Sequence, residues 1–280
     1  MKILVTGGVG RLGAKVVASL VNKGHHVNIF DLPQTNYRRV ENLPNTTVFK
    51  GDITSLENLK LACEGVDAVI HLAAILPPYS EKELQRTILV NVTGTTRLLE
   101  ALELTSSAPL FFSSSVCVYG QTQLEKSPIS SSHPLMISDN YSKSKIQAEE
   151  AIKGSRIKNS ILRLSAIYAA EPFEFPSPVQ FKADQRVEFI DQDDVIRAFV
   201  AAVEGNFHGS IMNIAGGSSW RMMGENFITG VFEAFGFEGS VDYPSDYGYF
   251  DWYDTDKSQQ LLEYQKASYS QFKKKLTMIF

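Results

Sequence analysis

The segment with the clearest chemical potential is YSKSK (141–145), in which a tyrosine and a lysine lie four residues apart. The surrounding stretch, DNYSKSKIQAEEAIKG (139–154), favours a helix, because it opens with N-cap residues and closes on a glycine. At this spacing Tyr141 and Lys145 share one helix face. An ammonium group near a phenol lowers the pKa of the phenol. The pair would suit acid–base catalysis near neutral pH; the alternative is a partly exposed tyrosine beside a solvated lysine.

A glycine-rich turn, TGGVGRLG (6–13), lies between a short apolar segment (2–5) and a helical pattern (12–24). Glycines at such a turn allow a pyrophosphate to approach the backbone, and the following helix directs its free N–H groups and the positive end of its dipole toward the phosphates. The alternative is a purely structural turn. The residues expected to contact cofactor phosphates are Gly7, Gly10, Arg11, Leu12 and Gly13.

An acidic residue, Asp31, ends the next apolar segment, 18 residues after Gly13. A carboxylate at this point can bind the adenosine ribose hydroxyls, and it repels the 2′-phosphate of NADP. Asp31 therefore favours NAD. NADP remains the alternative, because Arg11 lies in the phosphate turn and Arg38 and Arg39 could lie near the ribose.

The elements that must position these residues are short apolar segments that alternate with helical patterns. This alternation predicts an α/β fold with a Rossmann-type, doubly wound parallel sheet covered on both faces. The expected strands cover residues 2–5, 26–31, 47–52, 67–74, 109–120, 159–168 and 209–217. The expected helices cover residues 12–24, 55–65, 83–104, 139–154, 193–205 and 225–236.

The sequence changes character after Tyr168, where a proline-containing segment without a clear period begins. We expect a dinucleotide-binding core over residues 1–168, completed by about 187–214. Residues 169–186 and 215–280 are expected to form a small substrate-side part.

Composition excludes several classes of function. The chain has 280 residues, 44% of them hydrophobic and 21% charged, with a formal net charge of −4. This balance disfavours a nucleic-acid or acidic-membrane binder. Cys63 and Cys117 are expected to be buried thiols, and no Cys/His spacing suggests a metal site. With no leader or membrane-spanning pattern at its start, the chain is expected to be cytoplasmic.

Together the motifs resemble the extended branch of the short-chain dehydrogenase/reductase superfamily, the NAD-dependent epimerase/dehydratase family, and are similar to those of UDP-glucose 4-epimerase-like members. Beside the glycine turn, the resemblance rests on GDITS (51–55), HLAA (71–74), NVTGT (91–95), SSSVCVYG (113–120), YSKSK (141–145) and DQDDVIRAFVAAV (191–203). It covers most of the chain.

The resemblance implies a catalytic trio. Tyr141 would be the acid–base residue, Lys145 would lower its pKa and bind the nicotinamide ribose, and Ser115 would hold the substrate oxygen. Ser113 and Ser114 are expected only to satisfy nearby backbone groups, and His71 to pack and contact backbone. Further cofactor contacts are implied for Asp52, Ile53, Leu72, Ala73, Ala74 and Asn91. A homodimer built on a four-helix bundle is also implied.

The chain departs from members that act on nucleotide sugars. Ala166 stands where those members commonly carry an Asn, and the substrate region is short. Arg186 and Arg221 are the remaining candidates for binding a diphosphate; the alternative is that they are surface arginines. The aromatic stretch DYGYFDWYDT (246–255) could line a substrate pocket or form a satellite core.

Three functions follow. The first is NAD-dependent epimerisation or a related oxidation of a hydroxyl on a nucleotide sugar. The second is a net dehydrogenase or reductase acting on a non-nucleotide alcohol or ketone. The third is a cofactor-sensing protein without catalysis, which would not need Ser115, Tyr141 and Lys145 together.

Overall fold

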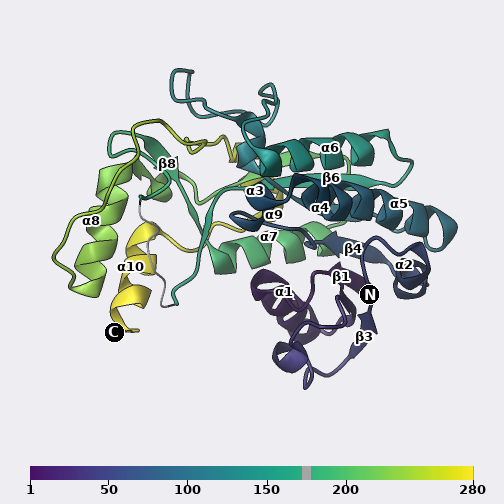
Figure 1. Cartoon of the computed structure of the whole chain (residues 1–280). Coiled ribbons are helices and arrows are strands. Elements are labelled where there is room, and N and C mark those ends of the chain that lie inside the picture. Colours follow the sequence, from purple (N-terminus) through teal and green to yellow (C-terminus); the bar gives the residue numbers. More distant parts are fainter. Residues whose placement is uncertain (172–177, 280) are drawn as a thin grey trace. The chain divides into compact units, whose positions relative to one another are not determined.

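The computed structural model describes residues 1–171 and 178–279 (Figure 1). Its central feature is a seven-stranded sheet in the order β10-β6-β5-β4-β1-β2-β3. Strand β1 pairs in parallel with β2 and β4, and the pairs β2–β3 and β4–β5 are also parallel. This arrangement confirms the predicted Rossmann-type α/β fold. The strands of this sheet are β1 (Lys2–Thr6), β2 (His26–Asp31), β3 (Thr46–Lys50), β4 (Ala68–His71), β5 (Leu110–Ser115), β6 (Asn159–Leu164) and β10 (Ile211–Ile214).

The helices predicted over 12–24, 55–65, 139–154, 193–205 and 225–236 form within two residues of their predicted bounds, as α1 (Arg11–Asn22), α2 (Leu56–Cys63), α6 (Asn140–Gly154), α7 (Gln192–Glu204) and α8 (Gly224–Phe235). The described residues also form α4 (Leu84–Ile88), α5 (Gly94–Leu104), α9 (Asp256–Leu262) and α10 (Tyr269–Thr277). A four-residue helix, α3 (Tyr79–Lys82), precedes α4. Short 3₁₀ turns cover Tyr37–Arg39, Val116–Tyr119 and Ser218–Trp220.

Several predicted elements end or change earlier than expected, and three of these differences bear on the candidate site. The strand predicted over 67–74 ends at His71, and the strand predicted over 109–120 ends at Ser115, where a 3₁₀ turn begins. The helix predicted over 83–104 is interrupted by a π-helical turn, Leu89–Thr93. These boundaries place polar side chains at the ends of the strands, where α/β proteins bind ligands.

The chain separates into two compact units. The first comprises Met1–Ser114, Asp139–Leu162 and Phe199–Ile211. Within it, α5 packs against both α2 and α6 (Figure 1). Apolar residues of these helices form a core with Leu4, Val69 and Phe112. Burial of this apolar surface stabilises the unit that carries the glycine turn.

The second unit comprises Ser115–Ser138, Arg163–Ala198 and Met212–Phe280. Two small sheets lie in it, one pairing β8 (Arg186–Glu188) with β11 (Arg221–Met223) and one pairing β7 (Ile167–Tyr168) with β9 (Ile190–Asp191). Helices α8 and α10 pack side by side over an aromatic core (Figure 1). The core aromatic residues include Phe181, Phe189, Trp220, Phe227, Phe250 and Phe272.

The predicted division into a core (1–168, completed by about 187–214) and a substrate-side part (169–186 and 215–280) stays a prediction. Residues 172–177 and 280 of that substrate-side part lie outside the described residues.

Candidate active site

The glycine turn joins β1 to α1 by a backbone path that only small residues permit. Gly7 adopts a positive φ of 69°, and a Cβ there would lie 2.8 Å from the amide nitrogen of Ala73. A Cβ on Gly13 would lie 2.1 Å from the carbonyl oxygen of Gly7. Both positions therefore require glycine, because any side chain would collide with the backbone.

The start of α1 is left available to an anion. Gly10 occupies the N-cap position, and no side chain among the described residues makes a capping hydrogen bond there. The first turn of α1 also contains no acidic residue. The N–H groups at Arg11, Leu12 and Gly13 lie at the positive end of the helix dipole, which suits a phosphate.

Asp31 ends β2 and braces the glycine turn. Its Oδ2 accepts a hydrogen bond from the Val9 N–H at 2.9 Å, and its Oδ1 accepts one from the Leu32 N–H at 2.9 Å. The residue is half-buried. A carboxylate offers about four acceptor positions, so two remain for ribose hydroxyl groups. Arg38 and Arg39 are exposed in the 3₁₀ turn that follows.

Two more predicted cofactor residues lie after β3. Asp52 is exposed, and its Oδ1 accepts from the Thr54 N–H at 2.9 Å and from the Thr54 hydroxyl at 2.7 Å. Ile53 is 5% exposed and belongs to the apolar core. The Asp52 contacts shape the local turn that leads into α2.

A buried hydrogen-bond chain connects the ends of β1 and β4. The Thr6 hydroxyl lies 2.6 Å from His71 Nδ1, and the Thr95 hydroxyl lies 2.9 Å from His71 Nε2. Thr95 donates its own proton to the carbonyl oxygen of Asn91, so His71 Nε2 donates to Thr95 and Nδ1 accepts from Thr6. The ring therefore contacts side-chain hydroxyls, where the sequence predicted backbone contacts.

His71 is held neutral in this chain. Burial, reinforced by the positive charge of Lys145, lowers the pKa of His71 to about 3. Leu72, Ala73 and Ala74 follow, beyond the strand. The N–H of Ala73 points to the Thr6 hydroxyl at 3.4 Å. A neutral, fully paired histidine suits a structural role at the turn.

Asn91 lies in the π-helical turn and holds the segment after β4 against α6. Its Oδ1 accepts from the Ile75 N–H at 2.7 Å, and its Nδ2 donates to the Ile75 carbonyl at 3.0 Å. Nδ2 also donates to the Ser144 hydroxyl at 3.0 Å, and that hydroxyl donates to the Tyr141 carbonyl at 2.8 Å. Asn91 therefore supports the first turns of α6, the helix of the Tyr–Lys pair.

The first turn of α6 carries Tyr141 and is capped twice. Asp139 is the N-cap and forms a capping box with Ser142. Glu81 of α3 adds a second cap: its carboxylate accepts from the Asn140 N–H at 3.0 Å and from the Tyr141 N–H at 3.1 Å. Local sequence patterns contain no signal for this second cap, because Glu81 is 60 residues away from Tyr141.

Lys145 is buried one turn after Tyr141, with an exposed fraction of 3%. Its ammonium group donates to the carbonyl oxygen of Ser113 at 2.8 Å. The same nitrogen lies 4.7 Å from the centre of the Phe112 ring and 5.6 Å from the centre of the Tyr141 ring. The structure thus brings the predicted pair together, with the positive charge beside the phenol ring.

Ser115 is the last residue of β5. Its hydroxyl caps the 3₁₀ turn that follows, accepting from the Cys117 N–H at 3.3 Å. Ser114 behaves differently from the prediction: its hydroxyl donates to the carboxylate of Glu149 at 2.6 Å and not to nearby backbone.

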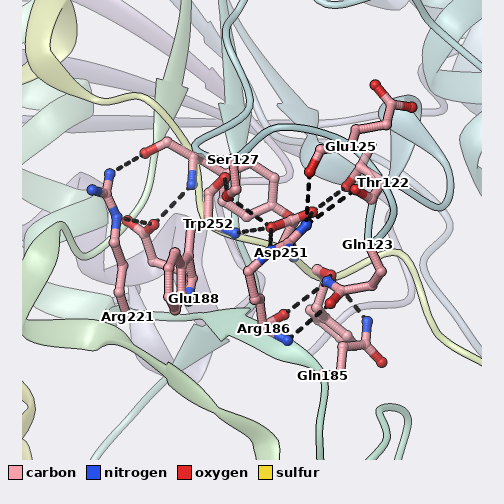
Figure 2. A network of polar contacts seen from close by, with 12 residues as sticks. Thr122, Gln123, Glu125, Ser127, Gln185, Arg186, Glu188, Arg221, Asp251 and Trp252 are labelled. Carbon is pink, nitrogen blue, oxygen red and sulfur yellow. Dashed lines mark hydrogen bonds and ion pairs between the residues drawn. The ribbon is translucent and has the colours of Figure 1, made fainter.

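Arg186, in the second unit, is held by a buried carboxylate (Figure 2). Its Nε and Nη2 donate to the two carboxylate oxygens of Asp251, at 2.7 and 2.9 Å. Asp251 is fully buried and also accepts from the hydroxyls of Thr122 and Ser127. The hydrogen bond to Asp251 raises the pKa of Arg186 against the lowering effect of burial, and the negative charge of Asp251 adds to the increase. The guanidinium charge is therefore already neutralised within the chain.

Arg221 has an equivalent partner across the β8–β11 pair. Its Nε donates to Glu188 at 2.9 Å, and its Nη2 donates to the carbonyl oxygen of Tyr253 at 2.5 Å (Figure 2). Burial raises the pKa of Glu188 to about 7, against the lowering effect of Arg221 and the N–H groups of Tyr253 and Gly217. Both predicted diphosphate arginines thus make ion pairs inside the second unit.

The aromatic stretch 246–255 supplies core residues. Phe250 is 3% exposed and packs with Phe181 and Phe189, and Tyr253 is fully buried. This matches the satellite-core alternative for these two residues.

Other predictions concern cysteines, metals and membranes. Cys63 and Cys117 are both buried thiols outside any disulfide, as predicted, and burial raises the pKa of Cys63 to about 12. Within residues 1–171 and 178–279, no cluster of three or more His, Cys, Asp or Glu side chains could hold a metal ion. The helices of the described residues include none with the length and apolar character to span a bilayer.

Comparison with curated proteins finds relatives of more than one activity. Over 170 residues the chain is 36% identical to a UDP-glucose 4-epimerase of Lactobacillus helveticus, and the matched region covers 58% of this chain and 51% of that protein. It is 29% identical to a 3-beta-hydroxysteroid dehydrogenase of Mycolicibacterium neoaurum, over 59% of this chain and 46% of that one. The chain thus spans about half the length of the curated relatives it matches.

Among solved structures, the fold is similar to that of a UDP-glucuronic acid 4-epimerase from Bacillus cereus in complex with UDP-glucuronic acid and NAD. The TM-score is 0.83 at 24% identity, and the match covers 100% of this chain and 98% of that one. Residues 3–179 match the sequence model of the NAD dependent epimerase/dehydratase family. That match covers more than half of the chain and agrees with the resemblance drawn from the motifs. The chain therefore belongs to the NAD-dependent epimerase/dehydratase family.

Proposed function

We propose that this protein is an NAD-dependent enzyme that transfers a hydride to or from the carbon of a substrate hydroxyl group. The observation that carries the proposal is the position of Lys145, buried with its ammonium group 5.6 Å from the centre of the Tyr141 ring. Burying a charge costs free energy unless specific partners hold it. A solvated surface lysine would not need the Ser113 carbonyl and two aromatic rings as neighbours.

Tyr141 would act as the general acid–base, taking the proton from the substrate hydroxyl during oxidation and returning it during reduction. Lys145 would stabilise the phenolate form of Tyr141, because an opposite charge at this range lowers a phenol pKa. Ser115 would hydrogen-bond the substrate oxygen and hold it in reach of Tyr141. NAD, when bound, supplies the hydride acceptor and donor.

The residues of the first unit fit NAD. The Gly7 and Gly13 backbone leaves no room for a Cβ, as a pyrophosphate cradle needs, and the start of α1 has no side-chain cap among the described residues. Asp31 would accept the adenosine ribose hydroxyls at its remaining acceptor positions. This also supports NAD over NADP, and NAD is the cofactor bound to the Bacillus cereus enzyme of similar fold.

Replacing Asp31 tests the cofactor preference. Asp31→Asn keeps an acceptor for the Val9 N–H but removes the charge that repels a 2′-phosphate. We expect NAD affinity to fall roughly tenfold, since a hydrogen bond to a charged group contributes about 1.5–3 kcal/mol, and the preference for NAD over NADP to shrink. Titrating both cofactors against both proteins measures this. A wild-type preference for NADP would show that Arg11 or the Arg38–Arg39 pair outweighs Asp31.

For the substrate, the first candidate is a nucleotide sugar or a related carbohydrate. Its hydroxyl would be oxidised either transiently, as in epimerisation, or permanently, as in a net dehydrogenation. The names of the epimerases similar to this chain support it. A diphosphate must be neutralised when it is buried, and Arg186 and Arg221 would have to do so.

The second candidate is a non-nucleotide alcohol or ketone, and the ion pairs of the second unit favour it. Asp251 and Glu188 already neutralise Arg186 and Arg221. Ala166 offers no polar group, and one relative is a steroid dehydrogenase. An uncharged substrate would leave both ion pairs in place.

Competition by UDP and dTDP separates the two candidates. A nucleotide-sugar enzyme should bind UDP or dTDP with a dissociation constant well below the millimolar range, as calorimetry would measure. Absence of binding at millimolar concentration would remove the first candidate. Purification of the protein with tightly held NAD would favour an epimerase, whereas turnover of added NAD would favour a dehydrogenase. The homodimer and the cytoplasmic location stay predictions.

A further inference from the structure

Glu149 is a buried acid that the proposed mechanism does not use. It lies on α6, one turn after Lys145, and its side chain is fully buried. One carboxylate oxygen accepts the Ser114 hydroxyl at 2.6 Å, and the other lies 3.1 Å from the ammonium group of Lys153. Burying a carboxylate costs free energy unless charged or hydrogen-bonding partners compensate it, and one of the two partners here is a neutral hydroxyl.

Two adjacent side chains of α6 bind two adjacent residues of β5. Lys145 binds the carbonyl oxygen of Ser113, and Glu149 binds the hydroxyl of Ser114. The Ser113 carbonyl belongs to the peptide group that joins Ser113 to Ser114, and a peptide group is planar and rigid. A displacement of Ser114 is therefore passed to the Ser113 carbonyl.

We propose that Glu149 is a positioning residue: by binding Ser114, it orients the Ser113 carbonyl that holds the Lys145 ammonium group beside Tyr141. The inference rests on the proposed hydride-transfer function, in which Lys145 tunes Tyr141. Lys153 keeps the far oxygen of Glu149 paired, with a side chain that is 39% exposed. Loss of the Ser114 contact would allow this end of β5 to shift and the ammonium group to move away from the phenol.

Four variants test the role of the hydrogen bond. Ser114→Ala removes the donor, Glu149→Leu removes the acceptor, and Glu149→Gln keeps an acceptor oxygen of the same reach. Glu150→Gln is the matched control, because Glu150 is the next residue on α6 and is exposed. Melting temperature and NAD affinity of each variant report on folding and on cofactor binding.

The first readout is the ionisation of Tyr141 without turnover. The ultraviolet difference titration of each protein against the same protein with Tyr141→Phe isolates the phenolate of this tyrosine. We expect Ser114→Ala and Glu149→Leu to raise the pKa of Tyr141 by roughly one unit, because the opposite charge moves away. Glu149→Gln and Glu150→Gln should leave it unchanged. Glu81, Asp139 and His71 are titratable groups near Tyr141 and Lys145, and they are the same in all variants.

The second readout is turnover. In Ser114→Ala and Glu149→Leu, kcat should fall roughly 10- to 100-fold, because small displacements of catalytic groups are costly, with NAD affinity within a few-fold of wild type. Glu149→Gln should recover most of the loss. The double variant Ser114→Ala/Glu149→Leu should have a kcat no lower than that of either single variant, because the two groups belong to one contact and their effects are not additive.

An unchanged Tyr141 pKa in Glu149→Leu would overturn the positioning role, as would equal losses in Glu149→Gln and Glu149→Leu. A wild-type protein that turns over no alcohol with NAD would count against the proposed function alone, because the titration of Tyr141 would still report on Glu149.

Discussion

Tyr141→Phe should lower turnover by roughly 10²–10⁴-fold, the range that general acid–base catalysis supplies. The variant loses only the hydroxyl group, so the ring remains beside Lys145 and the first turn of α6 keeps its caps at Asp139 and Glu81. NAD affinity should stay within a few-fold of wild type. Steady-state kinetics with NAD, together with calorimetric NAD binding, measure both effects.

The control for this substitution is Tyr243→Phe, which removes a hydroxyl from a partly buried tyrosine that packs against the core of the second unit. Its activity should equal that of the wild type. A Tyr141→Phe enzyme that keeps more than about a tenth of wild-type kcat would rule out Tyr141 as the acid–base residue. The cofactor-sensing alternative would then gain support, because sensing does not need this hydroxyl.

Among the substitutions proposed here, Arg221→Met should produce the largest decrease in the free energy of unfolding. Removing one partner of a buried ion pair typically costs about 3–5 kcal/mol, because the other charge stays buried without compensation. Within the described part of the chain, Glu188 would keep only the N–H groups of Gly217 and Tyr253 as hydrogen-bond donors. Urea unfolding of both proteins gives the difference in free energy of unfolding.

The loss should depend on pH in a defined direction. The pKa of Glu188 in the folded protein is about 7, above its ordinary value of 4.5. The protonated form therefore contributes stability that is present below pH 4.5 and lost as pH rises through 7. Arg221 lowers the pKa of Glu188, so its removal raises that pKa further. The destabilisation by Arg221→Met should thus be smaller at pH 5, where Glu188 is neutral, than at pH 8.

Two controls accompany this substitution. Arg97→Met breaks an exposed ion pair with Glu100 and should cost no more than about 1 kcal/mol. Adding Glu188→Gln to Arg221→Met removes the buried charge while keeping an acceptor oxygen for one of the two N–H groups, which donate to different carboxylate oxygens. That double variant should recover much of the stability and lose the pH dependence; equal stability of wild type and Arg221→Met at pH 8 would contradict the ion-pair interpretation.

Local sequence was sufficient for the features that depend on neighbours along the chain. The alternation of apolar segments and helical patterns predicted the Rossmann-type sheet, because period and turn chemistry are local properties. The strand–glycine–helix order located the turn at Gly7 and Gly13, and the four-residue spacing placed Lys145 beside Tyr141. Helical geometry alone brings such residues to one face.

Tertiary structure decided which polar groups find partners. Arg186 is paired with Asp251, 65 residues later, and Arg221 with Glu188, 33 residues earlier, so two arginines that the sequence offered to a diphosphate are held inside the chain. Glu149 and Ser114 meet across 35 residues, and Asn91 interrupts a predicted continuous helix while it binds Ile75. Such partners are chosen by which strands and helices pack together, because a buried charge or amide takes the nearest complementary group in space. Residue type and spacing therefore indicate what chemistry a side chain can do, and packing decides whether that side chain is available to do it.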